Sequence, residues 1–125
     1  MSTQGKAPLL TIETLTLIIH NAAALNPSVE AVGLVGSFAR GESTHRSDVD
    51  IIVKQHSGVK FNSILNDFGE YIRHVLDYQF NKRLDIIRYD LVVNRANRTP
   101  NKDEPWFCQE TFSQLLKDVK WLYER

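Results

Sequence analysis

The sequence contains little cysteine, no long apolar run and no excess of either charge. The one cysteine among 125 residues, Cys108, cannot form an internal disulfide, which is typical of a reducing compartment, so we expect a cytoplasmic protein. Lysine plus arginine count 15, as do aspartate plus glutamate, which disfavours nucleic acid as a direct substrate. The sequence lacks both an apolar run of about 18 residues and a signal-peptide pattern, so no membrane contact is expected.

The length allows one domain with a single core and leaves no room for a second, substrate-binding domain. We expect a disordered polar tail over residues 1–8 and one domain over residues 9–125. Apolar periodicity and turn residues predict helices over 11–25, 61–76 and 108–123, strands over 29–35, 48–54 and 82–89, a short helical turn over 37–41 and a loop over 94–105. This order predicts a small α/β domain with a mixed sheet packed by helices.

A glycine–serine turn and a pair of aspartates form the most informative pattern. Gly36 and Ser37 follow a predicted buried strand, and after ten intervening residues Asp48 and Asp50 open the next strand. Alternate strand residues point to one face, so the two carboxylates lie close together and repel each other unless a cation such as Mg²⁺ separates them. The turn offers backbone N–H groups at the start of a short helix, which suits a phosphate. Together these features indicate phosphoryl or nucleotidyl transfer.

This pattern resembles the signature of the nucleotidyltransferase superfamily related to DNA polymerase β. The strings from Gly36 to Glu42 and from Ser47 to Val53 are similar to those of its smallest members, the minimal nucleotidyltransferases (MNT proteins). The match is close over residues 36–53 and looser over residues 10–90. Many such proteins are antitoxins of a helical HEPN toxin. The resemblance implies ATP as substrate, two Mg²⁺ ions, and transfer of AMP to a hydroxyl, such as a tyrosine of a HEPN-type partner.

The resemblance also implies a third acidic residue on the following strand, and Asp85 fits that position. A carboxylate inside an apolar strand is costly to bury without a partner, and a metal ion would be one. The residues alone also allow an aspartate on the solvent face of an edge strand, or one paired with Arg83 or Arg88. Asp90 is the fallback. We therefore expect Asp48, Asp50 and Asp85 to be the catalytic, metal-binding residues.

The nucleotide-binding residues are expected to be Gly36, Ser37 and Arg40. The Arg40 guanidinium could reach a triphosphate bidentately, or it could pair with Glu42 at the surface. The apolar stripe of the predicted last helix is expected to pack over the sheet, although its aromatic neighbours leave room for a homo-oligomer or partner interface. Two other functions stay open: a small-molecule adenylyltransferase, and a non-catalytic antitoxin that acts by binding its partner.

Overall fold

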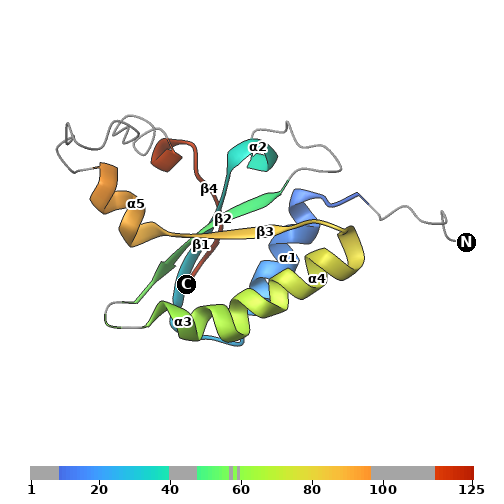
Figure 1. Ribbon diagram of the computed structural model, residues 1–125, viewed down its shortest axis with the longest axis horizontal. Helices are drawn as coiled ribbons and strands as arrows, with labels where there is room; N and C mark the ends of the chain where they lie inside the picture. Colours follow the sequence, from blue (N-terminus) through green and yellow to red (C-terminus); the bar gives the residue numbers. More distant parts are fainter. Residues whose placement is uncertain (1–8, 40–47, 57, 59, 97–114) are drawn as a thin grey trace, which may run out of the picture.

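The fold is a four-stranded sheet with helices on both faces, seen in a computed structural model that describes residues 9–39, 48–56, 58, 60–96 and 115–125 (Figure 1). The elements in chain order are α1 (Ile12–Ala23), β1 (Val29–Val35), α2 (Gly36–Ala39), β2 (Val49–Gln55), α3 (Phe61–Ile64), the π-helical segment η1 (Leu65–Gly69), α4 (Glu70–Phe80), β3 (Leu84–Arg88), α5 (Tyr89–Ala96) and β4 (Lys120–Glu124). The predicted 1–8 tail, Arg40 and Cys108 lie outside the described residues.

The sheet is mixed, as the sequence predicts. Its strand order is β3-β2-β1-β4, with β1 antiparallel to both β2 and β4 and with β2 parallel to β3. A parallel pair needs a long crossover, and the helical run from α3 to α4 provides it between β2 and β3. The predicted α/β class is confirmed.

Two apolar clusters cover the two faces of the sheet. On one face, which we call the α1–α4 face, Leu34 and Ile51 pack with Phe68 of η1 and with the buried residues of α1 and α4. On the other, the α5 face, Val35 and Ile52 pack against Val92. Figure 1 shows α1 and α4 together on one side of the sheet and α5 at its far end. No helix in the described part of the chain is long and apolar enough to span a membrane.

A buried asparagine joins the first turn to the crossover helix. The Asn26 amide donates to Asp67 Oδ1 at 3.0 Å and to the Ser63 carbonyl at 3.3 Å, and its oxygen accepts from the Ser28 N–H at 2.9 Å. Asn26 is only 7% exposed, so these bonds satisfy groups that water cannot reach. They fix the start of β1 relative to η1.

The predicted helix over 108–123 is wrong within the described residues. Residues 115–117 are helical, but Lys120–Glu124 form β4, which pairs with β1. Leu122 and Tyr123 pack on the α1–α4 face, and the Trp121 ring lies 5.8 Å from the Tyr89 ring. Pairing with β4 gives hydrogen-bond partners to the backbone groups along the second edge of β1. This stabilisation outweighs the preference for a helix that the spacing of apolar residues indicates. Of the expected stripe, Leu115, Leu116 and Val119 do pack over the sheet, on the α5 face, whereas Leu122 belongs to a strand of the sheet.

The predicted loop over 94–105 is also wrong at residues 94–96, the part of it that the structure describes. Residues 94–96 end the helix α5, which begins at Tyr89, immediately after β3. Buried Val92 explains the helix, because its contact with Val35 and Ile52 covers the α5 face. The predicted strand over 82–89 is shorter, Leu84–Arg88, and the predicted helix over 61–76 continues to Phe80 through the π-helical segment.

Candidate active site

The end of β1 and the start of β2 bring the glycine turn to the aspartate pair. The two strands are antiparallel, and Val35 pairs with Asp50, so Gly36 follows directly beside that carboxylate. Asp48 precedes β2 and is half-buried, like Asp50. Because Asp50 is two residues from Ile52, which packs against α5, its side chain lies on the α5 face.

Gly36 cannot be replaced by another residue without disturbing this arrangement. Its φ is +78°, in the left-handed region that glycine adopts without steric cost. A Cβ placed there would lie 2.5 Å from Asp50 Oδ2. The missing side chain therefore gives the Asp50 carboxylate its space, and the turn and the carboxylate form one site.

Asp85 lies beside Asp50 on the neighbouring strand. The two residues are in register in the parallel β2–β3 pair, which places both side chains on the α5 face. Asp85 is exposed, so the expectation of a buried carboxylate inside an apolar strand is wrong. The reason is that β3 is an edge strand of the described sheet. Its exposure matches the solvent-face alternative, but its register places it against Asp50.

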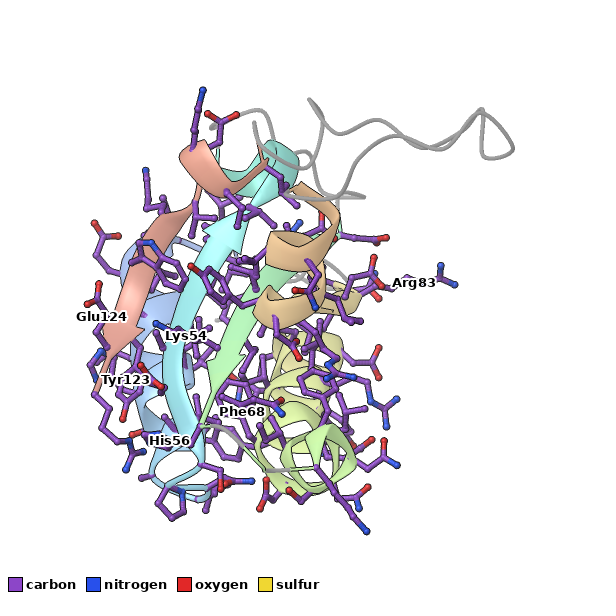
Figure 2. All side chains as sticks on the ribbon, turned by 90° about the vertical axis from the view of Figure 1, so that its left-hand side faces the viewer. Lys54, His56, Phe68, Arg83, Tyr123 and Glu124 are labelled. Carbon is purple, nitrogen blue, oxygen red and sulfur yellow. The ribbon has the colours of Figure 1, made fainter. Side chains whose placement is uncertain are left out.

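The two arginines considered as partners of Asp85 are directed elsewhere. Arg88 binds Asp90 through two hydrogen bonds, Nε to Oδ1 at 3.2 Å and Nη2 to Oδ2 at 2.8 Å. The carboxylate of Asp90, the fallback for Asp85, is thus engaged by Arg88. Arg83 points away from the body of the molecule (Figure 2). In the part of the chain that the structure describes, neither arginine forms an ion pair with Asp85.

The surroundings of Asp50 raise the cost of ionising its carboxyl group. Partial burial, the charge of Asp85, a hydrogen bond with the Asp85 side chain and the charge of Asp48 together raise the pKa of Asp50 from 3.8 to about 6. Burial contributes most, and both charge effects come from the other two predicted site residues. The site thus concentrates negative charge at one end of the sheet, where a cation would relieve the repulsion.

The donor set fits a hard cation such as Mg²⁺ by its chemistry, since all three groups are carboxylates. Within the described ranges, no three or more His, Cys, Asp or Glu side chains are arranged to hold a metal ion by themselves. Mg²⁺ usually binds through one or two carboxylates, several waters and substrate phosphates, so an open arrangement is consistent with it. We conclude that Asp50 and its neighbours could hold Mg²⁺ together with a nucleotide.

Two predicted nucleotide-binding residues, Ser37 and Arg40, cannot be compared fully with the structure. The backbone of Ser37 follows Gly36 in α2, whereas the role of its hydroxyl stays a prediction. Arg40 lies outside the described residues, so its predicted phosphate contact stays a prediction as well.

A groove on the opposite side of β3 was not anticipated from the sequence. Its volume is about 280 Å³, and it is lined by Leu65, Gly69, Glu70, Arg73, Leu84 and Ile86. Leu84 and Ile86 flank Asp85 in β3 but point to the α1–α4 face. The only hint in the sequence is Gly69, a residue with low helix propensity inside a predicted helix.

The fold and this site define a nucleotidyltransferase-type domain, and comparison with known proteins agrees. The family model described as "Nucleotidyltransferase domain" matches residues 18–122. The chain therefore belongs to the nucleotidyltransferase domain family, a family of transferases. No curated protein matches the sequence significantly.

Solved structures of the same fold have low sequence identity. A Sulfolobus solfataricus protein assigned to the nucleotidyltransferases is 18% identical, with a TM-score of 0.50, over 91% of this chain and 80% of its own. A protein assigned as a minimal nucleotidyltransferase is 21% identical, with a TM-score of 0.51, over 88% and 94%. A mutant of the MntA-HpeT toxin-antitoxin is 11% identical, with a TM-score of 0.51, over 93% and 75%. These similarities extend the resemblance of fold to minimal nucleotidyltransferases.

Proposed function

We propose that this protein transfers AMP from ATP to a hydroxyl group, using Asp48, Asp50 and Asp85 as the catalytic residues. One observation carries the proposal: the Asp50 carboxylate occupies the space that a side chain at Gly36 would fill. The turn that suits phosphate and the carboxylate that suits a metal therefore meet at one point. In-register Asp85 extends the same site across the sheet.

In this reaction the acceptor oxygen forms a bond to the α-phosphorus, and the bond from that phosphorus to the bridging oxygen of the β-phosphate breaks. Pyrophosphate leaves, and the hydroxyl proton is released to solvent. The backbone N–H groups of Gly36 and Ser37, at the start of α2, would position the phosphates. Exposed Asp85 lies at the open edge, where an acceptor hydroxyl can arrive from outside.

Asp48, Asp50 and Asp85 would hold Mg²⁺, which supplies neutralisation of the triphosphate charge and a lower pKa for the acceptor hydroxyl. The raised pKa of Asp50 supports this assignment, since burial and the charges of Asp85 and Asp48 disfavour its ionised form and a bound cation would favour it. The protein's own part is to fix the phosphates and the carboxylates at one end of a rigid sheet.

A tyrosine of a HEPN-type toxin is the acceptor that we propose, which makes this chain the antitoxin of a toxin–antitoxin pair in the cytoplasm. The resemblance to minimal nucleotidyltransferases supports this choice. A toxin-antitoxin of the same fold was solved as a mutant with two aspartates, spaced two positions apart, changed to glutamate. Asp48 and Asp50 have the same spacing.

The test incubates the purified chain with Mg²⁺ and ATP labelled on the α-phosphate, with and without the HEPN-type protein encoded beside it. We expect label on the partner, and none with Asp50→Asn or Asp48→Asn. Label transfer that persists in both variants would contradict the assignment of these residues.

Two alternatives give different outcomes in the same assay. A small-molecule adenylyltransferase would release pyrophosphate only when a small hydroxyl compound is added, and the partner would stay unlabelled. A non-catalytic antitoxin would form a stable complex with the partner without labelling the partner. The Asp50→Asn variant would then inhibit the toxin to the same extent as the wild-type protein does. Mass spectrometry of the labelled partner would identify the modified residue.

A further inference from the structure

The outer edge of β3 has backbone groups that face away from the sheet. The Val49 N–H donates to the Arg83 carbonyl at 2.9 Å, which fixes which residues of β3 bond to β2. In a parallel pair alternate residues face the neighbour, so Asp85 and Ile87 direct their backbone groups to β2, and Leu84 and Ile86 direct theirs outward. Among the described residues no strand lies beyond β3. The outward N–H and C=O groups of Leu84 and Ile86 are therefore oriented to pair with another strand.

The groove lies along this same edge. Leu84 and Ile86, whose backbone groups face outward, line it with their side chains. On the side of the groove opposite β3, η1 lies close to the strand, since a Cβ at Gly69 would be 3.0 Å from Ile86 Cδ1. Glu70 and Arg73 are bonded to each other at 2.6–2.7 Å, so the polar groups of the rim neutralise one another. An apolar side chain fits this groove better than a charged one.

The position of Asp85 connects the edge to the proposed reaction. Asp85 lies between the two groove residues in β3, and its side chain is on the opposite face. A strand added at the edge would lie about 4.8 Å from β3. Its side chains would alternate between the groove and the α5 face, so one of them would lie directly beside Asp85.

We infer that an extended segment of the protein acceptor adds to the outer edge of β3 as a fifth strand. Its apolar residues enter the groove, and the hydroxyl-bearing residue between them lies beside Asp85. This inference rests on the proposed function and adds to it the mode of acceptor recognition. In a helical partner the segment is a loop or a chain terminus.

Charge favours an acceptor segment over a second copy of β3. Arg83 is exposed and has no ion-pair partner in the described part of the chain, so an acidic residue near one end of the segment would pair with it. Two antiparallel copies of β3 would instead bring their Asp85 side chains near each other. That adds repulsion at a site that already holds Asp48 and Asp50.

Amide hydrogen exchange tests the backbone pairing, measured by NMR on the chain alone and in complex with the HEPN-type protein encoded beside it. Binding should slow exchange of the Leu84 and Ile86 amides about tenfold or more, since they gain partners, while the Asp85 amide, already paired with β2, changes less. A partner that fails to bind, or that binds without slowing these two amides, would overturn the inference.

Charge reversal tests the same edge in solution. Arg83→Glu should weaken binding of the HEPN-type protein about tenfold in calorimetry. The matched control is Lys120→Glu, because Lys120 is an exposed lysine on β4, the opposite edge strand of the described sheet. This variant should bind the HEPN-type protein like the wild type. Equal binding by both variants would contradict the inference. Label transfer and amide protection, both measured on the wild-type complex, separate the two proposals. Transfer without protection overturns the docking edge alone, and protection without transfer overturns the proposed reaction.

Discussion

Asp50 pairs in register with Asp85 across the parallel β2–β3 ladder, so adjacent strands carry two carboxylates on one face of the sheet. Like charges at such a position destabilise a sheet. The protein keeps the pair although burial and both neighbouring aspartates raise the pKa of Asp50. A cation bound between the carboxylates, as we propose, would offset this cost.

Asp50→Asn should stabilise the metal-free protein at neutral pH. The native pKa of Asp50 is about 6 against 3.8 ordinarily, so the folded state binds this proton more tightly than the unfolded chain. The stabilisation from protonation is complete below about pH 4 and is lost as the pH rises through about 6. Since the carboxylate is partly exposed, we expect a gain of only about 1–2 kcal/mol above about pH 7.

Urea unfolding with a chelator present, at about pH 4 and about pH 7.5, measures this gain. The variant and the wild type should converge at the lower pH. Asp77→Asn, an exposed aspartate on α4, is the control and should change stability by less than about 0.5 kcal/mol at either pH. A loss of stability in Asp50→Asn at neutral pH would contradict the prediction.

Gly36→Ala should cost about 2–4 kcal/mol of stability and should reduce nucleotidyl transfer. The left-handed φ of +78° strains any other residue, and the new Cβ would collide with Asp50 Oδ2. Gly58→Ala is a matched control, because Gly58 has a φ of +82° but no atom within 4 Å of its Cβ position. It should cost only about 1 kcal/mol. Equal losses in the two variants would show that contact with Asp50 is unimportant.

Asp85→Asn should reduce label transfer about a hundredfold or more, since it removes a charge from the proposed metal site. Asp90→Asn should keep transfer within about threefold of the wild type, because Asp90 is bonded to Arg88 and not to the site. Initial rates at saturating ATP separate the two variants. If Asp90→Asn were the inactive one, the assignment of the third carboxylate would be wrong.

Asn26→Ala should destabilise the fold by about 2 kcal/mol, since it leaves buried partners without their hydrogen bonds. Ser63→Ala is the control, because Asn26 bonds to the Ser63 carbonyl and the hydroxyl donates only to the Lys60 carbonyl at the surface. Thermal unfolding should show a clear loss for the first variant and a small one for the second.

The sequence predicts the site better than the edges of the fold. Gly36, Asp48 and Asp50 are close in the chain, so strand alternation and turn chemistry suffice to bring them together. Asp85 is distant, and its register with Asp50 depends on the crossover that makes β2 and β3 parallel. Its exposure could not be predicted, because no local pattern indicates which strand lies at an edge.

The C-terminal segment shows the opposite case, in which a local pattern is misleading. Leu115, Leu116, Val119 and Leu122 recur at helical spacing, yet Lys120–Glu124 form a strand. Leu122 interrupts the register with β1, so Leu122 and Tyr123 both face the α1–α4 side. Such a bulge imitates helical periodicity in the sequence.

The pairing of β1 with β4 also sets the order in which the protein can be completed during synthesis. Residues 29–35 pair with residues 120–124, so the strand that leads into Gly36 gains its second neighbour only after residue 124 has left the ribosome. The sheet that carries the proposed site is complete only from that point on. A nascent chain that already contains Asp48, Asp50 and Asp85 therefore still lacks one strand beside β1.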